Sequence, residues 1–423
     1  MKKIVFLLVV ILVACGSDSE QYVENIEQHS NNAVEQQEDS KQYAQDIQDT
    51  YVQRIAERFA NRNQLTPEDF LYDLEFLART LEENFPFLGV VERRFGNEQP
   101  LAAFIPNRTD FLTSASLATR INNTFRSFGN LAHLDLNPNH HWRVASGGNH
   151  NSSISTGSRI IEEGRIALIV IPTEFFEFPA PRSLFSRVQE VQNFIGEIQG
   201  YEHIILDLRH IGGGFIREVV DTFLRPNIQE TLKFREFAFI MDGEMAYRTH
   251  TNLVSRPPIL GGNLFLRNVP EIPLVPAREF AEQNNLIDMN AEDLENLAYG
   301  FILETLIDPI DNSVSAMPRK SLFADNIWLL IGSGNFSAAE IFSRLAKEAG
   351  FILVGQEANN RNSWGRVYFS LPRTENIVSM DLFYITDNTG RNTEEFPVEP
   401  HYFNRPGMDA LDTVLAIIAE RSE

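Results

Sequence analysis

The sequence contains only one cysteine in 423 residues. A single cysteine cannot form a disulfide within the chain, and its position, residue 15, leaves the body of the protein without a thiol nucleophile. Long apolar runs are scarce as well. Residues 4–14 form an unbroken apolar run that is too short for a membrane-spanning helix, and no later run is long enough to cross a bilayer.

Basic residues are also few. The chain has 36 Lys and Arg residues against 58 Asp and Glu residues, which gives a formal net charge of −22. Nucleic acids and anionic membrane surfaces are bound by clustered basic residues, so this balance argues against a nucleic-acid partner. Hydrophobic residues make up 43% of the chain, which is enough for a large apolar core in one big domain or two.

The one cysteine follows the short apolar run at the start of the sequence. Two lysines precede that run, and this order of charged and apolar regions is typical of an export signal. The run ends in Leu12-Val13-Ala14-Cys15, which resembles the lipobox of bacterial lipoproteins, whose cysteine is lipidated and becomes the mature N-terminus. We therefore expect residues 1–15 to be a lipoprotein signal peptide. The protein would then be anchored to a membrane through Cys15, outside the cytoplasm on the periplasmic or cell-surface side; an ordinary signal peptide is the alternative.

Two segments are expected before the main domain. Residues 16–64 are rich in Gln, Asn, Glu, Asp and Ser, which predicts a polar tether, and apolar residues at every fourth position in its second part indicate a helix. Thr66 and Pro67 then fit the N-cap and the first position of a helix. With a second helix expected over residues 111–128, we predict an N-terminal helical subdomain at residues 65–142.

Strands and helices alternate from residue 165 onwards, which predicts an α/β layer within a main domain at residues 143–423. The expected strands cover residues 166–171, 204–208, 327–331, 351–354 and 377–384, and the expected helices cover residues 184–198, 338–349 and 408–418. The Pro-rich residues 253–278 interrupt the alternation, and we expect an irregular insertion there.

Three glycines, Gly212 to Gly214, follow the expected strand at residues 204–208. Glycine permits unusual dihedral angles and a close approach of the backbone. Free amides at such a turn can bind the oxyanion that develops during acyl transfer. A plain turn at the end of the strand is the alternative.

Ser337 lies at a second strand end, where Ile331 to Phe336 lead through small residues into an expected helix. A serine at a helix N-terminus has free amides and a favourable dipole beside it, which suits an attacking hydroxyl. Ser337 and Glu340 also fit the capping box S-x-x-E, so a helix cap is the alternative.

Together, these segments resemble the C-terminal-processing (tail-specific) serine peptidases, including their tricorn-core branch. That family carries a D-L-R-x-N-x-G-G strand end and, further along, an S-A-x-E nucleophile turn. Residues 355–372 are similar to a third stretch of the family, V-G-x-P-T-G-G…Y-G-x-V…L-P. The residues that match the first two motifs are Asp207, Leu208, Arg209, Gly213, Gly214, Ser337, Ala338 and Glu340.

The resemblance implies a nucleophile, an oxyanion hole and a fold. The nucleophile is Ser337, and the oxyanion hole combines the amide of Ala338 with one from the turn at Gly213 and Gly214. The implied fold is α/β, with a crotonase/ClpP-like ββα catalytic core at residues 143–423 beside the helical subdomain. The implied chemistry needs no metal and no cofactor.

The resemblance also bears on the general base. One branch of the family uses a lysine well beyond the serine, but Asn362 stands at that place here, and the only lysine after Ser337 is Lys347. The tricorn-core branch instead takes a histidine from a short turn after the helical lobe, where this chain has His133. An imidazole suits proton transfer at neutral pH. His140 and His141 are alternatives, and a purely structural His133 is another.

A histidine base needs an acid that orients it. In the tricorn-core branch this acid is a glutamate shortly before a G-V-x-P-D segment, which residues 397–401 resemble. Glu394 is therefore the expected acid, with Glu395 as the alternative. A solvated loop carboxylate is the other interpretation of each.

Several positions depart from the family's pattern. Ile211 replaces its asparagine, Glu357 begins a segment that replaces P-T-G-G, Ala132 replaces a hydroxyl residue, and His401 replaces an aspartate. These changes either distort the oxyanion hole or mark a divergent branch. The stretch between His133 and the strand at residue 166 is also too short for a PDZ domain.

We therefore expect a serine-type endopeptidase that cleaves peptides or unfolded proteins outside the cytoplasm through an acyl-enzyme. Its partners would be such a substrate and, through Cys15, a membrane, while the sequence does not specify an oligomeric state. The alternative is a catalytically decayed peptidase scaffold that acts as a peptide- or ligand-binding lipoprotein.

Overall fold

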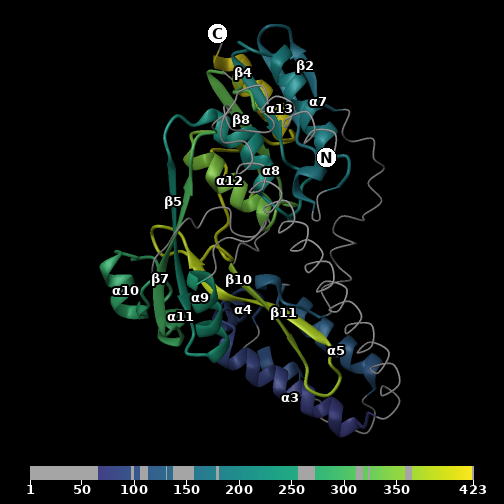
Figure 1. Ribbon diagram of the computed structural model, residues 1–423, viewed down its shortest axis with the longest axis vertical. Helices are drawn as coiled ribbons and strands as arrows, with labels where there is room; N and C mark the ends of the chain where they lie inside the picture. Colours follow the sequence, from purple (N-terminus) through teal and green to yellow (C-terminus); the bar gives the residue numbers. More distant parts are fainter. Residues whose placement is uncertain are drawn as a thin grey trace, which may run out of the picture. The chain divides into compact units, whose positions relative to one another are not determined.

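The computed structural model divides the chain after Thr66, and the second of the two units is Pro67–Glu423. The expected signal peptide, tether and tether helix lie outside the described residues, and so do His140, His141 and the expected domain boundary at residue 142. The residues described are 65–96, 100–104, 113–129, 131–136, 157–177, 181–255, 272–310, 318–322, 324–357 and 364–421 (Figure 1).

A largely parallel sheet forms one half of the second unit. Its strand order is β12-β9-β8-β4-β3-β2, and only β2 runs antiparallel to its neighbour. The central strands are apolar on both faces, as expected of parallel strands covered by helices on both sides. The bounds are β2 Arg159–Glu162, β3 Ile166–Val170, β4 His203–Asp207, β8 Asn326–Ile331, β9 Ile352–Gly355 and β12 Tyr402–Phe403.

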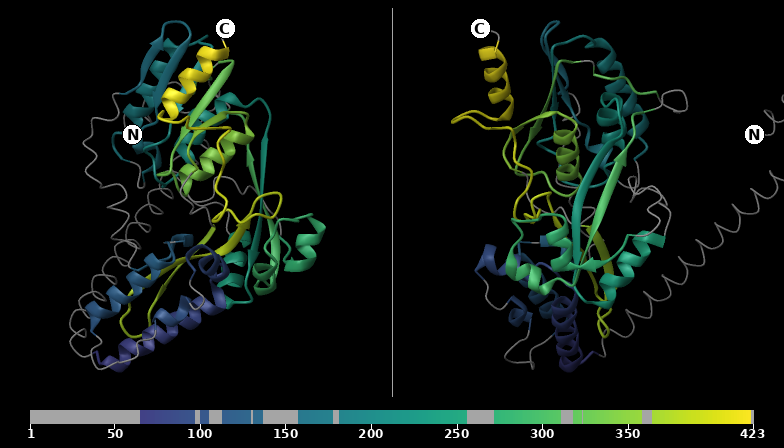
Figure 2. Two further views of the ribbon diagram at one scale, coloured as in Figure 1. Left: turned by 180° about the vertical axis from the view of Figure 1, so that it is seen from behind. Right: turned by 90° about the vertical axis from the view of Figure 1, so that its left-hand side faces the viewer.

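Helices cover both faces of this parallel sheet (Figure 2). One face packs on α7 (Leu184–Glu197) and α12 (Ala338–Glu348), in a core that includes Leu206, Leu329 and Phe342. The other face, with Trp328 at its centre, packs on α13 (Ala410–Arg421). The α/β class and the three helices were predicted from the sequence, and the structure confirms them.

An antiparallel sheet forms the other half. Its order is β1-β11-β5-β7-β6, and β10 pairs with the edge of β11 that lies opposite β1. The long strands β5 and β7 pair along nine residues each and were not predicted from the sequence. The bounds are β1 Asp135–Leu136, β5 Leu232–Ile240, β6 Val275–Pro276, β7 Tyr299–Ile307, β10 Trp364–Ser370 and β11 Ile377–Thr386.

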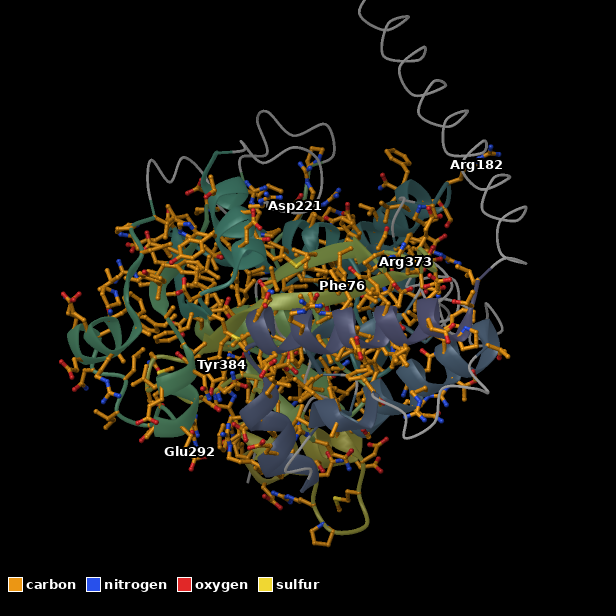
Figure 3. The ribbon with its side chains drawn as sticks, turned by 90° about the horizontal axis from the view of Figure 1, so that it is seen from below. Phe76, Arg182, Asp221, Glu292, Arg373 and Tyr384 are labelled. Carbon is orange, nitrogen blue, oxygen red and sulfur yellow. The ribbon has the colours of Figure 1, made fainter. Side chains whose placement is uncertain are left out.

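The N-terminal helices lie against this antiparallel sheet. The helix α3 runs over Pro67–Asn84 and buries an apolar stripe of Phe70, Leu74, Leu77 and Leu81. The helix α5, Ser114–Ser127, begins at a capping box formed by Thr113. Phe76 of α3 packs edge-on against Phe369 of β10, with ring centroids 6.4 Å apart. Asp73 of α3 accepts the amide of Arg373 in the β10–β11 turn at 2.9 Å (Figure 3 labels Phe76 and Arg373). The helices therefore cover the β10–β11 hairpin.

The remaining elements are short. Their bounds are α4 Leu88–Phe95, α8 Arg217–Val219, α9 Glu244–Ser255, α10 Ala277–Gln283 and α11 Ala291–Asn296, with 3-10 turns at Pro100–Phe104, Leu131–His133, Thr173–Phe176 and Arg225–Asn227 and a π-helical turn at Val220–Leu224. The expected insertion at residues 253–278 falls mostly outside the described residues. No helix in the described part of the chain is both long and apolar enough to cross a membrane.

Candidate active site

The predicted glycine turn, Gly212–Gly214, follows the end of β4. The amide of Ile211 donates to the carbonyl of Leu208 at 2.9 Å, which closes a turn directly before the glycines. Gly214 has φ +141°, and a Cβ added there would lie 2.0 Å from the carbonyl oxygen of Phe176. Position 214 therefore has no room for a side chain, and only glycine fits against the Phe176 backbone.

Ser337 immediately precedes α12 and has an unusual backbone. Its φ of 52° and ψ of −120° lie in a region that L-residues rarely adopt, and such strain costs about 1–3 kcal/mol. The side chain makes no capping hydrogen bond to the helix. The carboxylate of Glu340 also turns elsewhere: its Oε1 accepts from Arg344 Nε at 3.0 Å and from the amide of Val398 at 2.8 Å. The capping-box alternative is therefore wrong.

The glycine turn and the serine elbow, residues Phe336–Ala338, lie against each other. A Cβ added at Gly213 would lie 2.9 Å from the Cβ of Ser337, and the amide of Phe336 donates to the carbonyl of Gly212 at 3.2 Å. Among the described residues, no backbone hydrogen bond uses the amides of Gly213, Gly214 or Ala338. Backbone amides that are free to donate, next to a serine, are the groups that form an oxyanion hole.

His133 is placed by strand register. Asp135 of β1 lies opposite Ser379 of β11 in an antiparallel pair, so continuing the register by two residues sets His133 opposite Asp381. The hydroxyl of Ser379 donates to the carbonyl of His133 at 2.9 Å, which fixes the backbone there. Ala132 and His133 both have positive φ, of 48° and 49°, so the chain turns sharply at the histidine.

Asp381 is the carboxylate that meets His133. Its Oδ2 lies within hydrogen-bonding distance of His133 Nδ1, and its side chain is 1% exposed against 16% for the histidine. On the opposite side of β11, Arg366 is the cross-strand partner of Asp381, with Nε 3.6 Å from Oδ1. A buried carboxylate that accepts a hydrogen bond from Nδ1–H fixes the tautomer of the imidazole.

Glu394 was predicted as the acid that orients His133, whereas the carboxylate within hydrogen-bonding distance of the His133 ring belongs to Asp381. Glu394 lies in the loop after β11, where its amide donates to Asn392 Oδ1 at 2.9 Å and its carbonyl accepts from Arg94 at 2.8 Å. The alternative, Glu395, pairs with Arg93 at 2.7 Å. A local motif cannot show which acid the strand register brings to the histidine.

The sequence did contain a signal for Asp381. It is the one charged residue in β11, a strand of ten residues whose last nine are buried. A lone acid in a buried strand requires a charged or hydrogen-bonding partner, since an unpaired buried carboxylate is very unfavourable. That partner comes from a segment 248 residues away in sequence, so the pairing itself could not be read from the local pattern.

The structure thus forms two pairs, Ser337 with Gly213 and His133 with Asp381. The first pair belongs to the parallel sheet and the second to the antiparallel sheet. Within the described part of the chain, no hydrogen bond joins the Ser337 hydroxyl to the His133 ring. Catalytic hydrogen bonds of this kind often tighten only when substrate is bound.

Two of the departures from the family pattern have structural explanations. Ile211 is 3% exposed and packs in the core beneath the parallel sheet. His401 accepts a hydrogen bond from the amide of Leu353 through Nδ1 at 2.9 Å and donates its own amide to the carbonyl of the same residue. Burial lowers the pKa of His401, and the charge of Lys347 lowers it further, which favours the neutral ring that this accepted hydrogen bond requires. Glu357 precedes residues that are not described.

Comparison with known proteins gives one family. The sequence model of peptidase family S41 matches residues 165–403, which is more than half of the chain. No curated protein matches the sequence.

Several solved structures are similar at low identity. A candidate peptidase from Parabacteroides merdae is 12% identical, with 84% of this chain and 97% of that chain covered and a TM-score of 0.49. A lipoprotein from Streptococcus agalactiae is 15% identical, with 84% and 96% covered and a TM-score of 0.44. Mature CPAF complexed with lactacystin is 16% identical, with 56% and 47% covered and a TM-score of 0.36. At these TM-scores they add nothing to what the family match shows.

Proposed function

The chain belongs to peptidase family S41 and is a serine peptidase of the C-terminal-processing type, and from this premise we propose that Ser337, His133 and Asp381 are its catalytic residues. Ser337 is the nucleophile, His133 the general base and Asp381 the acid that orients the base. The amides of Ala338 and of Gly213 or Gly214 form the oxyanion hole. What carries the proposal is the strained, uncapped backbone of Ser337 beside unused amides.

The acylation step uses each of these groups once. The Ser337 oxygen attacks the substrate carbonyl carbon, and its proton passes to Nε2 of His133. Asp381 accepts a hydrogen bond from Nδ1–H of the same ring, which keeps Nε2 unprotonated beforehand and stabilises the imidazolium afterwards. The negative carbonyl oxygen of the tetrahedral intermediate is stabilised by the amides of the glycine turn and of Ala338.

Collapse of the intermediate breaks the peptide C–N bond. The leaving amine takes the proton from His133, and the acyl group stays on Ser337 as an ester. Water then attacks the ester while His133 accepts its proton, and the same ring returns the proton to Ser337 as the acid product leaves. For these transfers Nε2 of His133 must come within hydrogen-bonding reach of the Ser337 hydroxyl, a contact that we expect to tighten when substrate binds.

The proposed substrates are peptides and unfolded proteins. The catalytic step requires an extended chain that reaches Ser337 at the glycine turn, and an unfolded segment meets this requirement without a rearrangement of the substrate. The backbone strain at Ser337 also argues against the alternative of a decayed binding scaffold, because strain of this kind persists where the surrounding structure maintains it for chemistry.

The test uses purified protein that lacks residues 1–15. It should hydrolyse a denatured protein substrate, and Ser337→Ala should abolish the hydrolysis while the melting temperature stays within a few degrees of the parent. Hydrolysis by the Ser337→Ala variant at the parent rate would refute the assignment. Tight peptide binding without hydrolysis by the parent protein would instead support the decayed scaffold.

We further propose that the protein acts outside the cytoplasm as a lipoprotein anchored through Cys15. The support is the sequence of residues 1–15, with its charged start, short apolar run and lipobox-like end. Cells that express the full chain and are fed an alkyne fatty acid should label it, and Cys15→Ser should lose the label and leave the membrane fraction. Equal labelling of the variant would exclude a lipid at this cysteine.

A further inference from the structure

We propose that Asn335 is a positioning residue that clamps the glycine turn to the serine elbow and so sets the spacing of the two oxyanion-binding amides. The inference rests on the proposed function of Ser337, and it assigns a role to a residue that no motif singled out. Asn335 lies two residues before Ser337 and is fully buried.

The carboxamide of Asn335 joins three points of the backbone. Its Oδ1 accepts from the amide of Gly332 at 2.7 Å, and its Nδ2 donates to the carbonyls of Leu208 at 2.8 Å and Ile211 at 2.6 Å. The first point belongs to the loop that leads to Ser337, and the other two belong to the turn that leads to the glycines. Both protons of the side-chain amide are therefore used between the two segments.

Asn335 adds side-chain support to the turn before the glycines. The Ile211 side chain is apolar and packs in the core, so this side chain makes no hydrogen bond that could hold the glycine turn in place. The carbonyls of Leu208 and Ile211 both point to the same carboxamide, and their separation is fixed by its two N–H bonds. Asn335 thereby provides, from the loop that leads to Ser337, a polar anchor that residue 211 does not provide.

The spacing matters because the two amides act on one oxygen atom. An oxyanion hole is effective when its donors lie about 2.7–3.1 Å from the oxyanion, and small displacements of these donors lower the reaction rate strongly. Ala338 follows the loop that Asn335 closes, and Gly213 follows the turn that Asn335 holds. Loss of the clamp is therefore expected to reduce transition-state stabilisation more than substrate binding.

The decisive variant is Asn335→Asp, which has nearly the same shape. The introduced carboxylate still accepts from Gly332, but it cannot donate, and it faces two carbonyl oxygens. We expect kcat to fall about 100-fold with KM within about threefold of the parent, since removing an oxyanion donor costs 10²–10³ in rate. Asn335→Ser, whose hydroxyl donates one bond, should give a smaller loss.

The pH profile separates positioning from a general structural defect. Protonation turns the introduced carboxyl into a donor, and facing carbonyl oxygens favour that protonated form. The ratio of the variant's kcat to the parent's kcat should therefore rise as the pH is lowered from 8 to 6. A variant that is merely destabilised would show a constant or falling ratio.

Asn227 offers a matched control. Its side chain also makes three hydrogen bonds between separate segments. Nδ2 donates to the carbonyl of Phe223, and Oδ1 accepts from the Ser321 hydroxyl and from the Leu322 amide. None of these groups belongs to the site. Asn227→Asp should lower the melting temperature while kcat stays within about threefold of the parent. Equal kcat losses in Asn227→Asp and Asn335→Asp would overturn the inference.

A second readout distinguishes the failure of this inference from the failure of the proposed function. A fluorophosphonate probe reports the reactivity of Ser337 in each variant without a peptide substrate. If the parent protein is not labelled at Ser337, the proposed function fails and the role of Asn335 fails with it. If the parent is labelled and Asn335→Asp and Asn335→Ser are labelled at the parent's rate, only the positioning role is overturned.

Discussion

Replacing Asp381 by asparagine should nearly abolish turnover while leaving the shape of the site intact. Asp381 is fully buried and accepts a hydrogen bond from Nδ1 of His133. An asparagine can turn its NH2 group toward Nδ1 and so favour the opposite tautomer, in which Nε2 carries the proton and cannot accept another. In serine hydrolases with such a triad this change lowers kcat about 10⁴-fold, which is about 5.5 kcal/mol of transition-state free energy.

The structure makes this prediction specific to Asp381. Glu394 is the acid that a local motif would choose, yet its backbone contacts are with Asn392 and Arg94 and the carboxylate at His133 belongs to Asp381. The assay compares kcat of Asp381→Asn and Glu394→Gln on one peptide substrate, with thermal melting to confirm that both are folded. A thousandfold loss in Glu394→Gln with more than a tenth of the activity left in Asp381→Asn would refute the assignment of the acid.

Three further predictions concern the backbone and the stability of the fold. Gly214→Ala should reduce kcat more than 100-fold, because its Cβ would lie 2.0 Å from the carbonyl of Phe176, whereas Gly200→Ala, at φ +83° with open space around it, should cost about 1–2 kcal/mol of stability and no activity. Asp73→Ala should lower the free energy of unfolding by about 3 kcal/mol in urea titrations, since Asp73 is fully buried and accepts the amides of two residues in the β10–β11 turn at 2.9 and 2.7 Å. Burial lowers the pKa of His250, so the unfolded chain binds more protons below about pH 6.5, and stability should fall as the pH drops from 7 to 5; His250→Gln should make that fall shallower, and an unchanged slope would contradict the reasoning.

The elements that could be predicted from the sequence are those with a local signal. The helix α3 has a Thr-Pro start and an apolar stripe, and β4 and β8 are short apolar runs followed by glycine-containing turns. Ser337 and the glycine turn were found because strand, small residues and helix follow one another within a few positions. Local patterns of this kind predict structure well because they fix the backbone geometry of the same few residues.

The elements that were missed depend on pairing between distant segments. The strands β5 and β7 pair across about sixty residues of intervening chain, and nothing near either strand specifies its partner. The acid at His133 was missed for the same reason, because the register of β1 on β11 brings Asp381 to the histidine. Asn335 belongs to none of the motifs found in the sequence, and its role depends on two carbonyls more than a hundred residues earlier in the chain.

The central claim is that Ser337 is an activated nucleophile, and covalent labelling tests it most directly. Parent protein treated with a fluorophosphonate and digested should show one modified peptide, the one that contains Ser337, and prior incubation with a peptide substrate should slow the labelling. Asp381→Asn should be labelled far more slowly, because its His133 no longer accepts the serine proton. Absence of the adduct from the Ser337 peptide, or an adduct on another serine that survives Ser337→Ala together with hydrolysis, would contradict the account.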